Sequence, residues 1–135
     1  MKTFSATIAL FTDVGFLIKS RLQRSLPLPF AQCQTLSFVA ERQHPNMRDV
    51  ARHFKIAAPS ATFLVDELAR GGLIKRRADS TDRRKIELEL TAKGKTTLKT
   101  YMETRHKVLN RMFKALSESD RADLNRILTK ILASA

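Results

Sequence analysis

Near the middle of the chain, apolar residues recur at the spacing of a helix. The positions that share one helical face there are Met47, Val50, Ala51 and Phe54. Asn46 precedes this face and is placed to accept a hydrogen bond from the backbone N–H of Asp49. Residues 55–58 then form a short connector. The pattern therefore predicts a short helix with a capped start and a tight turn after it.

A second helix is predicted from about Pro59 to Arg70. Proline suits the first turn of a helix, because its missing N–H would have no partner there. The core side of this helix is expected to hold Ala61, Phe63, Leu64 and Leu68. Its polar residues, which can point elsewhere, are Ser60, Thr62, Asp66 and Glu67. Gly71 and Gly72 end the helix, since glycine readily takes the left-handed conformation found at many helix stops.

After the two glycines, the apolar pattern changes to the alternation of a strand, which predicts strands over residues 73–78 and 85–90. In the second strand, Ile86, Leu88 and Leu90 alternate with charged residues, so one face is expected to be buried. The polar loop ADSTDRR joins the strands. The basic residues around it are Arg76, Arg77, Arg83, Arg84 and Lys85. A helix, a turn, a second helix and a basic hairpin are the elements of a winged helix-turn-helix.

Two helices are predicted before this region, over residues 4–24 and 30–41, and Pro27 and Pro29 break the chain between them. The first helix carries an apolar stripe so wide that it is expected to pack against more than one neighbouring element. The members of this stripe are Phe4, Ile8, Leu10, Phe11, Val14, Leu17, Ile18 and Leu22. The core residues of the second helix are expected to be Phe30, Leu36, Phe38 and Val39.

Two more helices are predicted after the hairpin. Thr91 is placed to cap a helix over residues 92–116, which would be about 35 Å long. Ser117 or Ser119 caps a final helix, whose apolar stripe is Leu124, Ile127, Leu128, Ile131 and Leu132. The outer helices thus carry more apolar surface than a winged core can cover, which predicts a homodimer with interleaved helices. The alternative is a helical bundle closed within one chain.

The length of 135 residues suits one small domain with a helical extension. The expected fold class is mainly α with a small β-hairpin. Residues 30–96 would form a winged helix-turn-helix DNA-binding region. Residues 1–29 would form an N-terminal dimerisation helix, and residues 97–135 the C-terminal dimerisation helices.

The net charge of +12 predicts a polyanionic partner, either nucleic acid or an acidic membrane surface. The alternative from composition alone is a merely basic protein. The sequence shows no secretory signal and no apolar run long enough to span a bilayer, so no membrane partner is expected. One cysteine cannot form an internal disulfide, which favours the reducing cytoplasm.

Three motifs follow one another through the hairpin into the next helix. They are Leu68–x–x–x–Gly72–Leu73–Ile74–x–Arg76, Asp79–x–x–Asp82–Arg83–Arg84 and Leu90–Thr91–x–x–Gly94. Together they resemble the signature of MarR-type transcription regulators and cover roughly the middle third of the chain. The flanking helices agree with that family in length and order. The resemblance implies a homodimeric repressor that binds a near-palindromic operator in double-stranded DNA and is released by a small ligand.

The helix from Pro59 is the candidate for reading base edges, because the major groove admits a helix. Its exposed start offers Pro59, Ser60 and Thr62. Ser60 and Thr62 can donate to phosphates or bases, or bond only to local backbone near the helix start. This chain departs from the family's usual polar or basic groups at three positions, which are Ala57, Ala58 and Phe63. The helix is therefore expected to offer few side chains for bidentate contacts with bases.

By resemblance, Asp82 and Arg84 match the wing-tip pair of the family. The arginine would enter the minor groove, and the aspartate would hold its guanidinium through a charge-assisted bond. Arg83 is expected to meet phosphate. The other basic residues that would add to DNA binding are Arg70, Lys75, Arg76, Arg77 and Lys85. The alternative is a solvated turn that holds a surface salt bridge.

An effector pocket is expected by resemblance where the dimer helices meet the winged core, lined by Phe16, Phe30 and Phe38. Its ligand would be an aromatic acid or a phenol, as for many relatives. The alternative for these aromatic residues is plain core. Cys33 lies among apolar neighbours and is expected to be buried rather than to act in redox sensing.

No catalytic cluster is visible in the sequence. His44, His53 and His106 lack metal-ligand spacing, and no phosphate-cradling glycine loop or nucleophile with a base is present. We therefore expect no enzyme, no metal and no cofactor. The alternative to a sequence-specific regulator is an architectural or winged-helix interaction protein that binds DNA without sequence preference. An enzyme acting on nucleic acid is disfavoured by the lack of a catalytic cluster.

Overall fold

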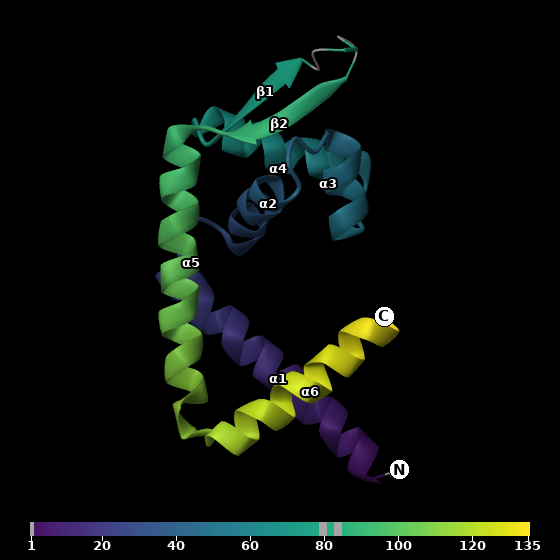
Figure 1. Cartoon of the computed structure of the whole chain (residues 1–135), viewed down its shortest axis with the longest axis vertical. Helices are drawn as coiled ribbons and strands as arrows, with labels where there is room; N and C mark the ends of the chain where they lie inside the picture. The colour runs from purple at the N-terminus through teal and green to yellow at the C-terminus, as the bar shows by residue number, and fades with distance from the viewer. Residues whose placement is uncertain (1, 79–80, 83–84) are drawn as a thin grey trace.

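The computed structural model describes residues 2–78, 81–82 and 85–135. Within them the chain forms helices, one short 3-10 turn and a two-stranded hairpin. The elements are α1 (Lys2–Ser25), α2 (Phe30–Glu41), α3 (Met47–Phe54), α4 (Ala58–Arg70), β1 (Ile74–Ala78), β2 (Ile86–Leu90), α5 (Ala92–Met112), η1 (Phe113–Ala115) and α6 (Glu118–Ser134). In Figure 1, α2 to α4 and the hairpin lie together at one end, and α5 leads away from them toward α1 and α6. The predicted fold class is confirmed.

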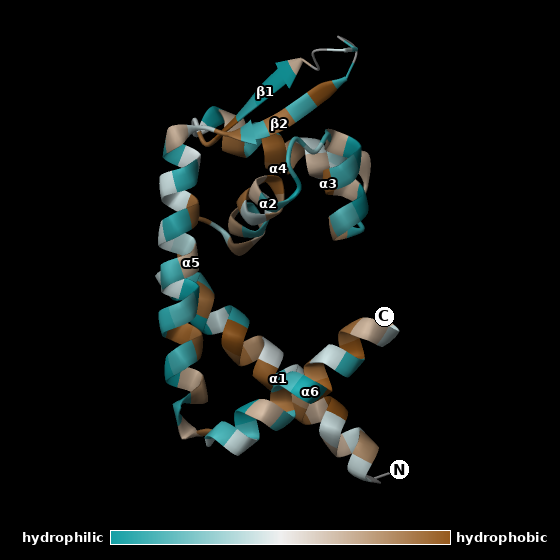
Figure 2. Cartoon of the chain, viewed as in Figure 1, coloured by the Kyte–Doolittle hydropathy of each residue, from teal (hydrophilic) through white to brown (hydrophobic). Residues whose placement is uncertain are grey.

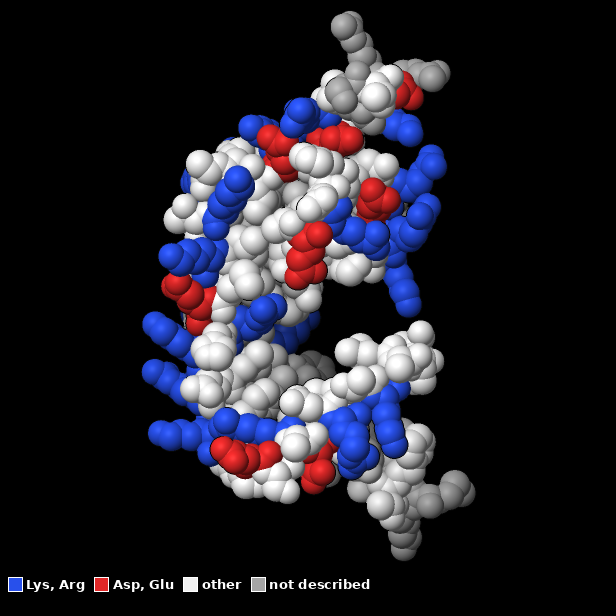
Figure 3. All heavy atoms as spheres, viewed as in Figure 1, with Lys and Arg blue, Asp and Glu red and all other residues white. Residues whose placement is uncertain are grey.

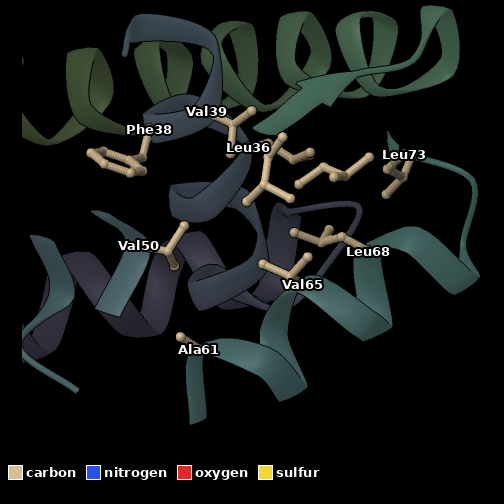
Figure 4. Packing of buried hydrophobic residues seen from close by; sticks show 10 residues of the cluster. Leu36, Phe38, Val39, Val50, Ala61, Val65, Leu68 and Leu73 are labelled. Atoms are coloured by element: carbon tan, nitrogen blue, oxygen red, sulfur yellow. The ribbon is translucent and has the colours of Figure 1, made fainter. Parts of the chain in front are cut away.

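A cluster of buried apolar side chains joins α2, α3, α4 and the hairpin. Figure 4 shows these side chains converging between the elements. The members are Leu36, Phe38, Val39, Val50, Ala61, Val65, Leu68, Leu73, Ile74 and Leu88. Because every element from α2 to β2 contributes to this core, the core fixes how α4 is held against the hairpin.

The start of α3 is held by a reciprocal pair of hydrogen bonds. The backbone N–H of Asp49 donates to the side-chain oxygen of Asn46 at 2.8 Å. The backbone N–H of Asn46 donates in return to the carboxylate of Asp49 at 2.9 Å. The cap predicted for Asn46 is confirmed, and it is a full capping box. At the other end, Lys55 takes a left-handed conformation with φ 53° and begins the turn toward α4.

The core face of α4 differs from the predicted one. Ala61, Val65 and Leu68 are buried, but Phe63 is 64% exposed, so its assignment to the core was wrong. At 3.6 residues per turn, residue 63 lies about 200° around the helix from residue 61, nearly opposite the buried face. Leu64, at the edge of that face, is only partly buried.

The hairpin is antiparallel, with Ile74 opposite Leu90 and Arg76 opposite Leu88. Leu88 is fully buried, whereas Ile86 is 45% exposed. Of the predicted buried face, Leu88 is confirmed and Leu90 is partly buried. The prediction was wrong for Ile86, because its pair with Ala78 is the outermost one of the hairpin and lies beyond the core. The backbone N–H of Leu88 also donates to the carbonyl of Pro45 at 2.7 Å, which ties β2 to the segment before α3.

The start of α5 is fastened to the turn that follows α4. The backbone N–H of Gly94 donates to the hydroxyl of Thr91 at 3.0 Å, as predicted for a capping threonine. The same hydroxyl donates to the carbonyl of Gly72 at 2.6 Å. Gly72 has a φ of 74°, a conformation that favours glycine. Thr91 therefore links the end of the hairpin to the turn that follows α4.

The outer helices leave much apolar surface uncovered. In α1, the large apolar side chains that are exposed are Phe4, Ile8, Leu10, Phe11, Val14, Phe16 and Leu17. In α6, which begins at the predicted cap Ser117, they are Ile127, Leu128, Ile131 and Leu132, and no α6 residue is buried. Figure 2 shows apolar bands along both helices. The chain thus does not form a closed bundle by itself, and no described helix is both long and apolar enough to cross a bilayer.

Candidate nucleic-acid interface

The outward side of α4 begins with four exposed residues, Pro59, Ser60, Thr62 and Phe63, which we term the reading face. The core cluster on the opposite side of α4 holds this face toward solvent. Ala57 precedes the helix and makes no side-chain cap. The predicted residues Pro59, Ser60 and Thr62 are therefore accessible together, and Phe63 joins them.

Exposed cations lie on α3, which packs against α4, at the C-cap of α3 and just before β2, and we term them the basic edge. The members are Arg48, Arg52, Lys55 and Lys85. Arg48 and Lys85 line one shallow cavity of about 330 Å³, although they are far apart in sequence. Figure 3 shows basic side chains projecting from the side of the molecule where α3 lies. Arg48 and Arg52 of α3 were not among the predicted DNA contacts, although each lies two residues from buried Val50 and so nearly opposite it on the helix.

Several predicted DNA contacts are engaged in ion pairs within the chain. Arg70 lies 2.7 Å from Glu67 on α4. Arg76 of β1 is paired with Asp66 of α4. Each of these two arginines was predicted to contact DNA, and in the structure each faces a carboxylate of the same chain.

Across the hairpin, Glu89 is shared by two cations. The Lys75 ammonium lies 2.9 Å from its carboxylate, and the Arg77 guanidinium lies 3.5 Å from it. The hydrogen bond from Lys75, aided by Arg77, lowers the pKa of the Glu89 carboxyl against a smaller opposing effect of desolvation. Glu89 therefore stays ionised and offsets part of the positive charge of the hairpin.

The wing tip is described only in part. Asp82 is partly buried, and its carbonyl accepts a hydrogen bond from the backbone N–H of Lys85 at 3.0 Å. Arg83 and Arg84 lie outside the described residues, so the predicted pair of Asp82 with Arg84 stays a prediction.

A cavity of about 640 Å³ lies where α2, β2 and α5 meet. Its apolar lining comes from Val39, Leu88, Leu90, Leu98 and Met102, and its polar lining from Gln43, His44, Glu89, Lys95, Lys99 and Glu103. The three phenylalanines predicted to form an effector pocket are not among the residues that line it. Phe16 is 71% exposed on α1, and Phe30 is partly buried. Phe38 belongs to the core and stacks on His53 with ring centroids 4.3 Å apart.

Cys33 is buried, as predicted, and its thiol contacts the carbonyl of Leu28 at 3.6 Å. Burial raises the pKa of the Cys33 thiol, which disfavours the reactive thiolate. Among the residues that the structure describes, no group of histidine, cysteine, aspartate and glutamate side chains could hold a metal ion.

Comparison with known proteins places the central region in a family. Residues 26–85 match the model of the MarR family. The transcriptional repressor MprA of Escherichia coli (strain K12) is 36% identical over 74 residues, which cover 55% of this chain and 42% of that protein. The chain thus spans less than half the length of this relative.

Solved structures agree with the fold over nearly the whole chain. A MarR family protein from Bacillus stearothermophilus has a TM-score of 0.88 at 20% identity, and the match covers 98% of this chain and 95% of that one. The S. aureus MepR–DNA complex gives a TM-score of 0.79 at 24% identity, with 94% and 96% covered. At these identities the likeness shows the fold.

The sequence match and the structural match point to the same group of proteins. The curated relatives MprA and YetL are transcriptional repressors by name, which agrees with the expectation that the chain is no enzyme. Residues 26–85 match the MarR family in sequence, and the chain as a whole has the fold of solved MarR family proteins.

Proposed function

We propose that this protein is a homodimeric transcription repressor that binds a near-palindromic operator in double-stranded DNA. The observation that carries this proposal is the exposed reading face of α4, together with the exposed cations of the basic edge on and around the neighbouring α3. A helix with this exposure can enter the major groove while the flanking cations meet phosphates. The relatives agree, because MprA is a repressor by name and MepR forms a DNA complex.

The dimer is proposed from the uncovered apolar stripes of α1 and α6. Surfaces of this extent on a water-exposed chain mark an interface, and a second copy offers the same stripes in a self-complementary arrangement. In this proposal residues 1–29 and 97–135 form the dimer, and residues 30–96 form the DNA-binding region. Two reading helices would then meet half-sites about 34 Å apart, one turn of DNA.

At the wing tip, we propose that Arg84 enters the minor groove and that Arg83 meets phosphate. The support is the resemblance of the Asp82–Arg83–Arg84 motif to the family's wing. Lys85 adds to this contact from the basic edge. The predicted roles of Arg70, Arg76 and Arg77 are weaker in this proposal, because each already faces a carboxylate.

The proposed effector site is the cavity between α2, β2 and α5. Its apolar lining suits an aromatic ring, and Lys95 and Lys99 on α5 suit a carboxylate or phenolate. A ligand there would contact both the hairpin and the helix that leads to the dimer region. Binding can therefore alter how the reading helices are spaced and weaken operator binding.

The test is fluorescence anisotropy with DNA fragments that the purified protein retains from a random pool. We expect one short near-palindrome, two protomers per site, and a log affinity that falls steeply and linearly with log salt. Retained fragments with no common sequence would favour the architectural alternative. A salt-insensitive complex, or one protomer per site, would contradict the proposal.

The effector is tested by titrating phenolic acids into the complex at fixed salt. Release of DNA is expected, and Lys95→Gln with Lys99→Gln should raise the ligand concentration needed without changing affinity for DNA alone. Equal release from the parent and the double variant would show that the ligand acts elsewhere. Lys107→Gln, on the same helix but outside the cavity lining, is the matched control.

A further inference from the structure

Phe63 is an exposed aromatic residue at the centre of the reading face. It is 64% exposed and lies nearly opposite the buried side of α4. A single exposed apolar residue is ordinary on a protein surface. Phe63, however, lies on the side of α4 where a winged helix-turn-helix presents its base-reading side chains. The apolar character of this ring therefore affects which bases the helix can recognise.

The rest of the outward side of α4 offers little for bidentate reading of bases. Next to Phe63 are Pro59 and the short side chains of Ser60 and Thr62. Further along the helix, the charged groups are engaged within the protein. Glu67 is paired with Arg70, and Asp66 is paired with Arg76. No Asn, Gln, Lys or Arg side chain lies on the first two turns, which are residues 58–65.

The surroundings favour DNA over a protein as the occupant of this face. The basic edge lies on α3, at its C-cap and just before β2, and the whole chain carries a net charge of +12. An exposed apolar group on a helix that packs against the cation-bearing α3 complements a groove that has apolar methyl groups and is bordered by phosphates. One phenylalanine with Pro59 is also far smaller than a stable protein interface requires.

We propose that Phe63 reads thymine through its C5-methyl group in the major groove. Thymine alone among the four DNA bases carries this methyl group, and contact with an apolar side chain discriminates it without hydrogen bonds. The inference rests on the proposed function, because it requires α4 to enter the major groove. It makes Phe63 a specificity-determining residue and predicts at least one thymine in each half-site that is selected for its methyl group.

The experiment removes the methyl group from DNA and the ring from the protein. In a duplex retained by the parent protein, each thymine of a half-site is replaced in turn by deoxyuridine, which pairs identically but lacks the methyl. We expect at least one replacement to weaken binding about fourfold, the loss expected for one buried methyl group. In Phe63→Ala the same replacement should have no effect, whereas Phe63→Leu should keep part of the sensitivity.

Control measurements separate this inference from the proposed function. Phe63→Ala should melt like the parent, because the ring is exposed, and Thr62→Ala should keep the fourfold sensitivity to the methyl group. Sequence-specific binding by the parent that is indifferent to every deoxyuridine overturns the role of Phe63 and leaves the proposed function standing. A loss that persists unchanged in Phe63→Ala also overturns it. Failure of the parent to bind any duplex overturns both the role of Phe63 and the proposed function. If Phe63→Ala changes self-association but not DNA binding, the role in DNA reading is overturned and the face is assigned to a protein contact.

Discussion

Gly94 on the first turn of α5 packs directly against the backbone of Leu73, so closely that a Cβ at residue 94 would overlap the Leu73 carbonyl oxygen. The same carbonyl accepts a hydrogen bond from the backbone N–H of Thr91 at 3.0 Å. Because a backbone carbonyl cannot rotate away as a side chain can, this position admits only glycine without a shift of α5. The contact sets where the long helix leaves the winged core.

The first prediction is that Gly94→Ala destabilises the protein. The added methyl group must push α5 away from the turn between α4 and β1, and overpacking of this kind costs about 1–3 kcal/mol. Gly71→Ala is the matched control, since its Cβ would meet neighbours only at ordinary van der Waals distances of 3.6 Å or more. Urea unfolding of both variants measures the difference. Equal stability of the two variants would show that α5 adjusts freely.

The second prediction concerns the wing tip. Asp82→Ala should weaken DNA binding, although it removes a negative charge from a surface that faces phosphate. Simple electrostatics predicts a gain, and only an orienting role toward Arg84 predicts a loss. Anisotropy on one duplex at fixed salt decides the sign. Arg84→Ala should weaken binding markedly and leave the melting temperature near that of the parent. Binding by Asp82→Ala as tight as that of the parent would mean that the aspartate is only a turn residue.

The third prediction tests the dimer. Leu128→Asp should dissociate or unfold the protein, because it places a charge in the proposed apolar interface. Leu128 is 39% exposed in the single chain, so a strict monomer would tolerate the change better. Thr129→Asp, about 100° further round α6 from Leu128 and outside the apolar stripe, is the control with the same added charge. Light scattering at micromolar concentration gives the mass, and a stable monomer of the parent protein would contradict the dimer.

The fourth prediction concerns the ion pair between Asp66 of α4 and Arg76 of β1. Both side chains are more than one third exposed, so solvent screens the pair and a double-mutant cycle should give a coupling of about 0.2–1 kcal/mol. Arg76→Ala should also reduce DNA affinity less than Arg48→Ala does, since the charge of Arg76 is already offset by Asp66. A larger loss of DNA affinity in Arg76→Ala than in Arg48→Ala would show that Arg76 contacts DNA despite its pair with Asp66.

The fifth prediction follows from the raised pKa of the buried Cys33 thiol. At neutral pH the native protein should resist alkylation, and unfolded protein should react. As the pH rises past the ordinary pKa of a thiol, the unfolded state ionises first, so the contribution of Cys33 to the free energy of unfolding is lost with rising pH. Cys33→Ala should flatten that part of the stability curve. Rapid alkylation of the folded protein would show an accessible thiol.

Local chemistry made much of the fold predictable from the sequence. Asn46 with Asp49 marks the start of α3, and Thr91 marks the start of α5, because a cap depends only on residues three positions apart. The strand period likewise placed Leu88 on the buried face of the hairpin. These features require no knowledge of distant neighbours.

The tertiary structure decided what several elements face. The sequence pattern placed Phe63 on the core side of α4, and only packing against α2 and the hairpin selected Ala61, Val65 and Leu68 and left Phe63 in solvent. Folding also brought Arg48 beside Lys85 and set Arg76 against Asp66. Residues that are distant in sequence meet only after the core forms. The sequence by itself therefore determined where the helices and strands begin and which residues can form an apolar face. The shared core determined that Phe63 and the cations around α3 remain exposed for a partner.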